Sequence, residues 1–183
     1  MEALDGADRG KSRVRRWTYR VWQALTGLWP RISEVDRAEA RAWLSERQFA
    51  LWAQQTPRDQ RHSLRVLRLL RAWGWEARPL MQAALLHDVG KSVTKPTLWH
   101  RTVWVLAGAL APRWRSFLIR KQGWRRPFWV LAEHPRLGAE MARAAGCDEE
   151  VVWLIAHHQE EKVNENSARA RWWQALKRAD QRS

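Results

Sequence analysis

The sequence predicts an all-α protein, a single-domain orthogonal array of short helices, and three observations support this fold class. Apolar residues recur at spacings of three and four along most of the chain, as on one face of an α-helix. Strand signals are weak, because apolar and polar residues never alternate for long and the chain has only one Tyr and three Phe. The length of 183 residues, 45% of them hydrophobic, suffices for one domain with a core.

Capping residues and prolines set the expected helix boundaries in the first half of the chain. The first helix is basic, carries an apolar stripe and is ended by Pro30. Thr56 and Pro57 are a typical N-cap and first-turn pair. Pro79 begins the helix that leads into the sequence His-Asp-Val-Gly. The helices expected in this half cover residues 11–29, 34–45, 46–55, 57–74 and 79–89.

Prolines and glycines also divide the second half into helices. Residues 92–96 are expected to form a loop, Pro112 separates two helices, and Pro135 ends a short one. Gly146 is a plausible left-handed cap, and Asp148 begins a helix whose first turn is acidic. The helices expected here cover residues 98–110, 113–121, 125–132, 136–145, 149–158 and 168–180.

Composition limits the class and the surroundings of the protein. One cysteine, Cys147, cannot form an internal disulfide and is expected to be a buried spectator thiol. The longest apolar candidate, residues 102–112, is too short to span a bilayer. The N-terminus lacks the apolar stretch of a signal peptide, so a cytoplasmic location is expected.

The net charge of +14 predicts an anionic partner: a nucleotide, a nucleic acid or an anionic membrane surface. The arginine content is equally consistent with compositional drift, since arginine, alanine and tryptophan are all abundant. The 15 tryptophans mostly lie beside apolar residues or at helical spacing, which favours burial in the core.

The histidines carry the strongest functional signal. Five of the six fall in an ordered series that closes with a carboxylate. Imidazole and carboxylate are the side chains that hold divalent metals of intermediate hardness. The series, which we expect to form a metal site, consists of His62, His87, Asp88, His134, His157, His158 and Asp180.

The order H…HD…H…HH…D resembles the HD-domain superfamily of metal-dependent phosphohydrolases, and HDVGK at residues 87–91 is similar to its HDIGK variant. In that superfamily a minimal mononuclear site has the pattern H…HD…D. Carried over to this sequence, the pattern implies the ligands His62, His87, Asp88 and Asp180. The resemblance places the HD domain at residues 56–183, after a basic helical extension at residues 1–55.

Two further motifs resemble binuclear members, in particular the cyclic-dinucleotide phosphodiesterases called HD-GYP. His134 begins an HPxxG sequence, and His157-His158 matches their HH pair, which is divided between metal and substrate. The resemblance therefore implies two divalent ions, of Mn, Fe, Ni, Co or Mg, with Asp88 as the bridging carboxylate. The GYP tripeptide is absent, and Arg58 stands where some trinuclear relatives carry Glu, so neither cyclic di-GMP specificity nor a third metal is implied.

The resemblance implies an enzyme that cleaves a phosphomonoester or phosphodiester of a nucleotide-like substrate with a metal-activated hydroxide. Asp88 and Lys91 are the expected catalytic residues, and Lys91 and Arg61 the expected contacts to the substrate phosphate. Two alternatives remain open at this stage. One is a regulatory HD module that binds metal and nucleotide without turnover. The other is a nucleic-acid or membrane-surface binder that works through residues 11–29.

Overall fold

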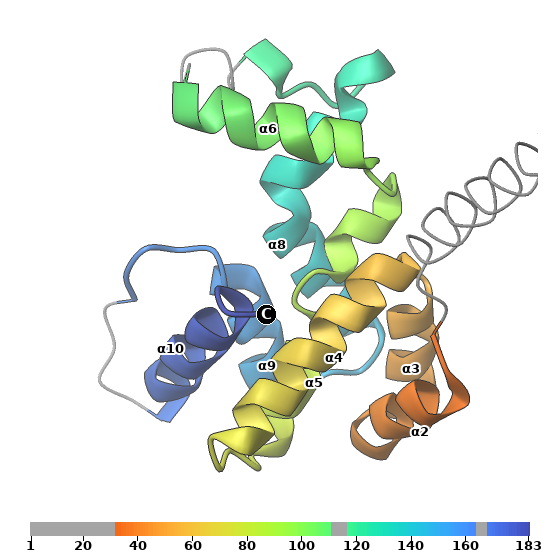
Figure 1. Cartoon of the computed structure of the whole chain (residues 1–183), viewed down its shortest axis with the longest axis vertical. Helices are drawn as coiled ribbons and strands as arrows, with labels where there is room; N and C mark the ends of the chain where they lie inside the picture. Colours follow the sequence, from red (N-terminus) through yellow and green to blue (C-terminus); the bar gives the residue numbers. More distant parts are fainter. Residues whose placement is uncertain (1–31, 111–116, 164–167) are drawn as a thin grey trace, which may run out of the picture. The chain divides into compact units, whose positions relative to one another are not determined.

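The structure is a computed structural model that describes residues 32–110, 117–163 and 168–183. Residues 32–183 form one compact unit (Figure 1). All regular secondary structure in the described residues is helical, which confirms the predicted all-α class. The elements are α2 (Glu34–Trp43), α3 (Glu46–Ala53), α4 (Pro57–Ala72), α5 (Arg78–Leu86), η1 (Val89–Val93), α6 (Leu98–Leu110), η2 (Gly123–Arg125), α8 (Arg126–Ala144), α9 (Glu149–His157) and α10 (Ala168–Asp180).

Side-chain caps begin the first three of these helices where the sequence predicts. Ser33 and Ser45 each form a reciprocal capping box with the side chain three residues later. Thr56 Oγ1 accepts a hydrogen bond from the Asp59 amide, and Pro57 occupies the first helical turn. The helix predicted over residues 11–29 lies outside the described residues. None of the helices in the described part of the chain is long and apolar enough to cross a bilayer.

Helix α5 lies at the centre of this unit. Residues 80–90 are all buried, and α5 contacts α2, α3, α4, α9 and α10. Apart from Arg78 and Gln82 its residues are apolar, as expected of a helix surrounded by other helices. Helices α2 and α3 supply Ala40, Phe49 and Trp52 to the same core. Residues 34–53, which the sequence places in an N-terminal extension, thus share the core of the domain.

Helix α8 corrects a prediction. Pro135 was expected to end a short helix, but α8 runs without a break from Arg126 to Ala144 and contains Pro135 in its interior. A proline at this position removes the amide that would bond to the carbonyl of Leu131. The Nδ1 atom of His134 donates to that carbonyl instead, at 2.9 Å, so the carbonyl keeps a partner and the helix continues.

Two smaller boundaries also differ from expectation. The helix predicted over residues 79–89 ends at Leu86, three residues earlier than expected, and residues 89–93 form the 3-10 turn η1. The helix expected over residues 113–121 lies partly outside the described residues, and residues 119–122 are not helical. Gly146 does adopt the predicted left-handed conformation, with φ of 79°.

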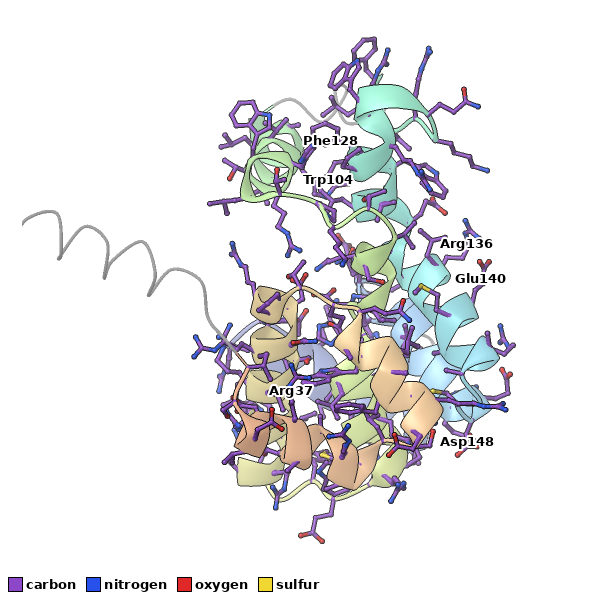
Figure 2. All side chains as sticks on the ribbon, turned by 90° about the vertical axis from the view of Figure 1, so that its right-hand side faces the viewer. Arg37, Trp104, Phe128, Arg136, Glu140 and Asp148 are labelled. Atoms are coloured by element: carbon purple, nitrogen blue, oxygen red, sulfur yellow. The ribbon has the colours of Figure 1, made fainter. Side chains whose placement is uncertain are left out.

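Helix α6 is fixed to the rest of the domain at two points. The ring of His100 lies edge-on to Phe128 of α8, with centroids 5.3 Å apart, and Trp104 also lies at this contact (Figure 2). The guanidinium of Arg101 makes two hydrogen bonds, of 2.8 and 2.7 Å, to the buried carboxylate of Asp59 in α4. This ion pair is the main polar tie between α6 and the helix that carries His62.

Replacing Arg101 by Met is expected to lower the free energy of unfolding by about 3 kcal/mol, because the buried Asp59 carboxylate loses its counter-charge. Urea unfolding followed by circular dichroism measures the change. The double variant Arg101→Met/Asp59→Leu serves as the control and should recover much of the loss. A single variant as stable as the parent would show that the pair contributes nothing.

Candidate metal centre

Six of the seven residues in the predicted metal set converge in space although they span nearly 120 positions of the sequence. Two lie inside helices, and four lie at or next to a helix end. The six are His62 of α4, His87 after α5, Asp88 before η1, His134 of α8, His158 after α9 and Asp180 of α10.

They form two groups of three around one carboxylate. His62, His87 and Asp180 make the first group, and Asp88, His134 and His158 the second; within each group the ligand atoms lie within 4.8 Å of one another. Asp88 joins the groups through its two oxygens. Its Oδ2 lies 4.0 Å from Nε2 of His62 and 3.7 Å from Nε2 of His87. Its Oδ1 lies 3.3 Å from Nε2 of His134 and 3.8 Å from Nε2 of His158.

The histidines are oriented by a shared hydrogen bond. The Nδ1 atoms of His87, His134 and His158 each lie within 3.0 Å of the backbone carbonyl three residues earlier. A carbonyl can only accept, so each Nδ1 carries a proton, and the Nε2 of a neutral ring presents a lone pair. These carbonyls have lost their helical amide partner, two at helix ends and one to Pro135.

The three Nε2 atoms are buried and, within the described part of the chain, have no hydrogen-bond partner. A buried polar atom without a partner costs free energy. The three Nε2 atoms lie 3.3 to 3.8 Å from the oxygens of Asp88, so lone pairs face lone pairs, which adds a repulsion. A cation between them removes both costs. Ligand atoms bound to one ion at about 2.1 Å lie about 3.0 to 3.4 Å apart, so the atoms around Asp88, which are 3.3 to 4.0 Å from its oxygens, would need to move together by a few tenths of an ångström. The donor set therefore fits divalent ions of intermediate hardness.

The electrostatics of the cluster favour a cation as well. Burial would raise the pKa of the Asp88 carboxyl, but Lys91 and His87 hold that pKa well below its usual range. Burial similarly opposes ionisation of Asp180, yet contacts from His62 and His87 keep its pKa below the ordinary value. Burial, with His87 and His134, lowers the pKa of His158 to about 3, so this imidazole is a neutral ligand at pH 7.

Two glycines allow the backbones of η1 and α8 to touch. A Cβ atom added to Gly90 would lie 2.1 Å from the carbonyl oxygen of His134 and 2.8 Å from the amide nitrogen of Gly138. A Cβ on Gly138 would in turn meet the amide nitrogen of Gly90 at 3.2 Å. The glycines of HDVGK and HPRLG therefore bring Asp88 within reach of His134.

Of the remaining predicted site residues, Lys91 lies at the cluster, whereas Arg61 and His157 do not belong to it. Lys91 lies beside the cluster, with its Nζ 2.5 Å from Oδ2 of Asp88. Arg61 is exposed on α4. His157 lies outside both groups, because Trp153 stacks on its ring and the carbonyl of Trp153 holds its Nδ1 at 2.7 Å. Of the histidine pair, the structure thus brings only His158 to the cluster.

One contact was missed at the sequence level. Ser183 Oγ donates to the carbonyl of Asp180 at 3.0 Å and lies 2.9 Å from Nδ1 of His62, which leaves Nε2 of His62 to face Asp180. A single serine at this position carries no sequence signal, because its role depends on how α10 packs against α4.

Comparison with known families identifies the class. The sequence model of the HD-domain family matches residues 60–182, about two thirds of the chain. The chain therefore belongs to the HD-domain family. The match confirms the predicted superfamily and does not distinguish its HDIG or HD-GYP branches. No curated protein gives a significant match to this chain, and neither does any solved structure.

The division of the histidine pair predicts opposite results for two adjacent substitutions. His158→Ala removes a buried ligand atom beside Asp88 and should lower the affinity for Mn²⁺ by at least about 10²-fold, more than loss of an outer-shell partner. His157→Ala should leave that affinity unchanged. Isothermal titration of the full chain with Mn²⁺ compares them, and equal losses in both variants would contradict the arrangement.

Gly90→Ala should separate η1 from α8 and so remove bound metal, because the added methyl group has no space beside the His134 carbonyl. The cost in unfolding free energy is expected to be about 2 kcal/mol or more. Gly74→Ala is the matched control. It also destabilises, since Gly74 has φ of 84°, but nothing lies within 4 Å of its added methyl, so metal content should be retained. Retention of metal by Gly90→Ala would refute the close-approach argument.

Proposed function

We propose that this protein is a metal-dependent phosphohydrolase that cleaves a phosphomonoester or phosphodiester bond in a nucleotide-like substrate. The observation that carries the proposal is the position of Asp88 between a half-buried and a buried group of ligand atoms, which suits a pair of divalent ions. When bound, such ions lower the pKa of water and neutralise the oxygens of a phosphate. Membership in the HD-domain family supports the same reaction class.

The residues around the cluster have roles that need no covalent intermediate. Lys91 holds a positive charge next to Asp88 and keeps 15% of its side chain exposed, and its ammonium has further N–H donors to offer a phosphate oxygen. The buried imidazoles keep the ligand atoms fixed and exclude water from one side of the site. Cys147 does not provide a thiolate, because burial and Asp148 raise the pKa of its thiol to about 11.

The substrate class is proposed from charge. The net charge of +14 favours an anionic substrate in general. Lys91 provides the local contact next to the cluster. Elemental analysis of the purified full chain, coupled to hydrolysis of a panel of phosphomonoesters, nucleotides and cyclic dinucleotides, tests the proposal. Metal content with no turnover on any member of the panel would instead favour a regulatory module that binds metal and nucleotide.

Asp88→Asn should abolish hydrolysis and most of the metal content, because it removes the charge that both groups share while preserving shape. Lys91→Met should retain metal and lower kcat/KM by about 10²-fold, as expected for the loss of one charged donor to the reacting phosphate. Lys162→Met, at an exposed lysine outside the cluster, is the control and should behave as the parent. Hydrolysis that survives Asp88→Asn would disprove the assignment.

A further inference from the structure

A second functional feature lies in the stretch between Asp88 and Glu133. Residues 89–132 contain no Asp or Glu, although they hold nine Lys or Arg and five Trp. Elsewhere in the described part of the domain several exposed arginines form ion pairs with nearby acids, as Arg136 does with Glu140 (Figure 2) and Arg143 does with Glu149. Lys91 and Arg101 pair with Asp88 and Asp59 from outside the stretch, and the stretch has no acid of its own to balance its other seven cations.

The outward side of α6 is apolar, opposite to what a helix facing water requires. Leu98, Trp99, Val105 and Leu106 are 50% to 70% exposed. Their spacing of one, seven and eight residues places them on one face of the helix. Other positions of the helix already have partners, through the contact of His100 with Phe128 and of Arg101 with Asp59. The helix thus leaves a second apolar face uncovered in the described unit.

The segment that leads into α8 is also both apolar and cationic at its surface. Phe117 and Trp124 are 55% and 66% exposed. Arg125 fixes their backbone and rings, because it donates to the carbonyl of Phe117 at 2.8 Å and lies over both rings. The exposed cations of this region are Lys95, Arg120, Lys121 and Arg126.

Charge and chemistry select the occupant of this region. A second copy of the chain carries the same excess of positive charge, and residues 1–31 contain seven Lys or Arg against three acids, so both would be repelled. A nucleic acid satisfies the cations but leaves Leu98, Val105 and Leu106 in water. An anionic bilayer satisfies both, because tryptophan and aliphatic side chains enter the headgroup boundary while Lys and Arg contact lipid phosphates.

We propose that this cationic apolar surface, formed by the outward face of α6 (Leu98, Trp99, Val105, Leu106) and by residues 117–126, binds the surface of an anionic phospholipid bilayer. The binding is peripheral, with the apolar side chains at the level of the headgroups. It is independent of the metal cluster, because none of these side chains belongs to either ligand group. The proposal differs from a membrane role for residues 11–29, which are a separate part of the chain.

Sedimentation of the full-length protein with vesicles tests the proposal. The parent should bind to vesicles of phosphatidylcholine and phosphatidylglycerol, and should bind much less to vesicles of phosphatidylcholine alone. Trp99→Ser/Leu106→Ser should weaken this binding by at least about tenfold, the effect of removing one buried large side chain. Trp124→Ser, outside α6, should weaken it independently. Metal content and melting temperature should stay at parental values, which separates this test from that of the hydrolase assignment.

Charge is tested with matched triple variants. Arg120→Gln/Lys121→Gln/Arg126→Gln should abolish the preference for phosphatidylglycerol. Arg13→Gln/Arg15→Gln/Arg16→Gln removes the same charge elsewhere and should retain the preference. Equal losses in the two triple variants would overturn the proposal in favour of a bulk charge effect. Unchanged vesicle binding after Trp99→Ser/Leu106→Ser would overturn it as well. So would a parent that binds duplex DNA, or self-associates, through this surface and ignores vesicles.

Discussion

The structure depends on the neutralisation of one buried carboxylate. Asp88 is 4% exposed, at the end of the most buried helix, and imidazole nitrogens approach both of its oxygens. Lys91 supplies one counter-charge. Three of the neighbouring nitrogens present buried lone pairs within the described residues, so the cluster has too few positive charges for its ligands. A centre of this composition would gain stability from bound cations, because they supply the positive charge that its ligand atoms lack.

The fold serves this centre through backbone features rather than through the ligands alone. Carbonyls without helical amide partners at the ends of α5 and α9, and opposite Pro135 in α8, fix the proton on Nδ1 of three histidines. The contact between Gly90 and Gly138 sets the distance between η1 and α8. The positions of the ligand atoms are therefore fixed by backbone groups that do not themselves face the centre. Pro135 belongs to this set, because it leaves the Leu131 carbonyl free to accept from Nδ1 of His134.

Much of this was predictable from the sequence, and the rest depends on packing. Helical periodicity and caps such as Thr56-Pro57 predict the helices well, because these signals are local. The order of histidines and carboxylates predicted the six residues that converge, together with His157, which does not, because this order resembles that of the HD-domain family. The predicted helix end at Pro135 is wrong, because Nδ1 of His134 replaces the missing amide as the partner of the Leu131 carbonyl. A side-chain contact of this kind leaves no local signal in the sequence. The choice between His157 and His158 depends on the rotation of α9, which adjacent identical residues cannot specify.

The central claim is that two divalent ions share Asp88. The most direct measurement is anomalous diffraction from crystals of the full-length protein grown with Mn²⁺. The account predicts two anomalous peaks, one among His62, His87, Asp180 and Oδ2 of Asp88, and one among His134, His158 and Oδ1 of Asp88. Diffraction data that show no peak at this cluster, with the three Nε2 atoms hydrogen-bonded to water or protein, would contradict it.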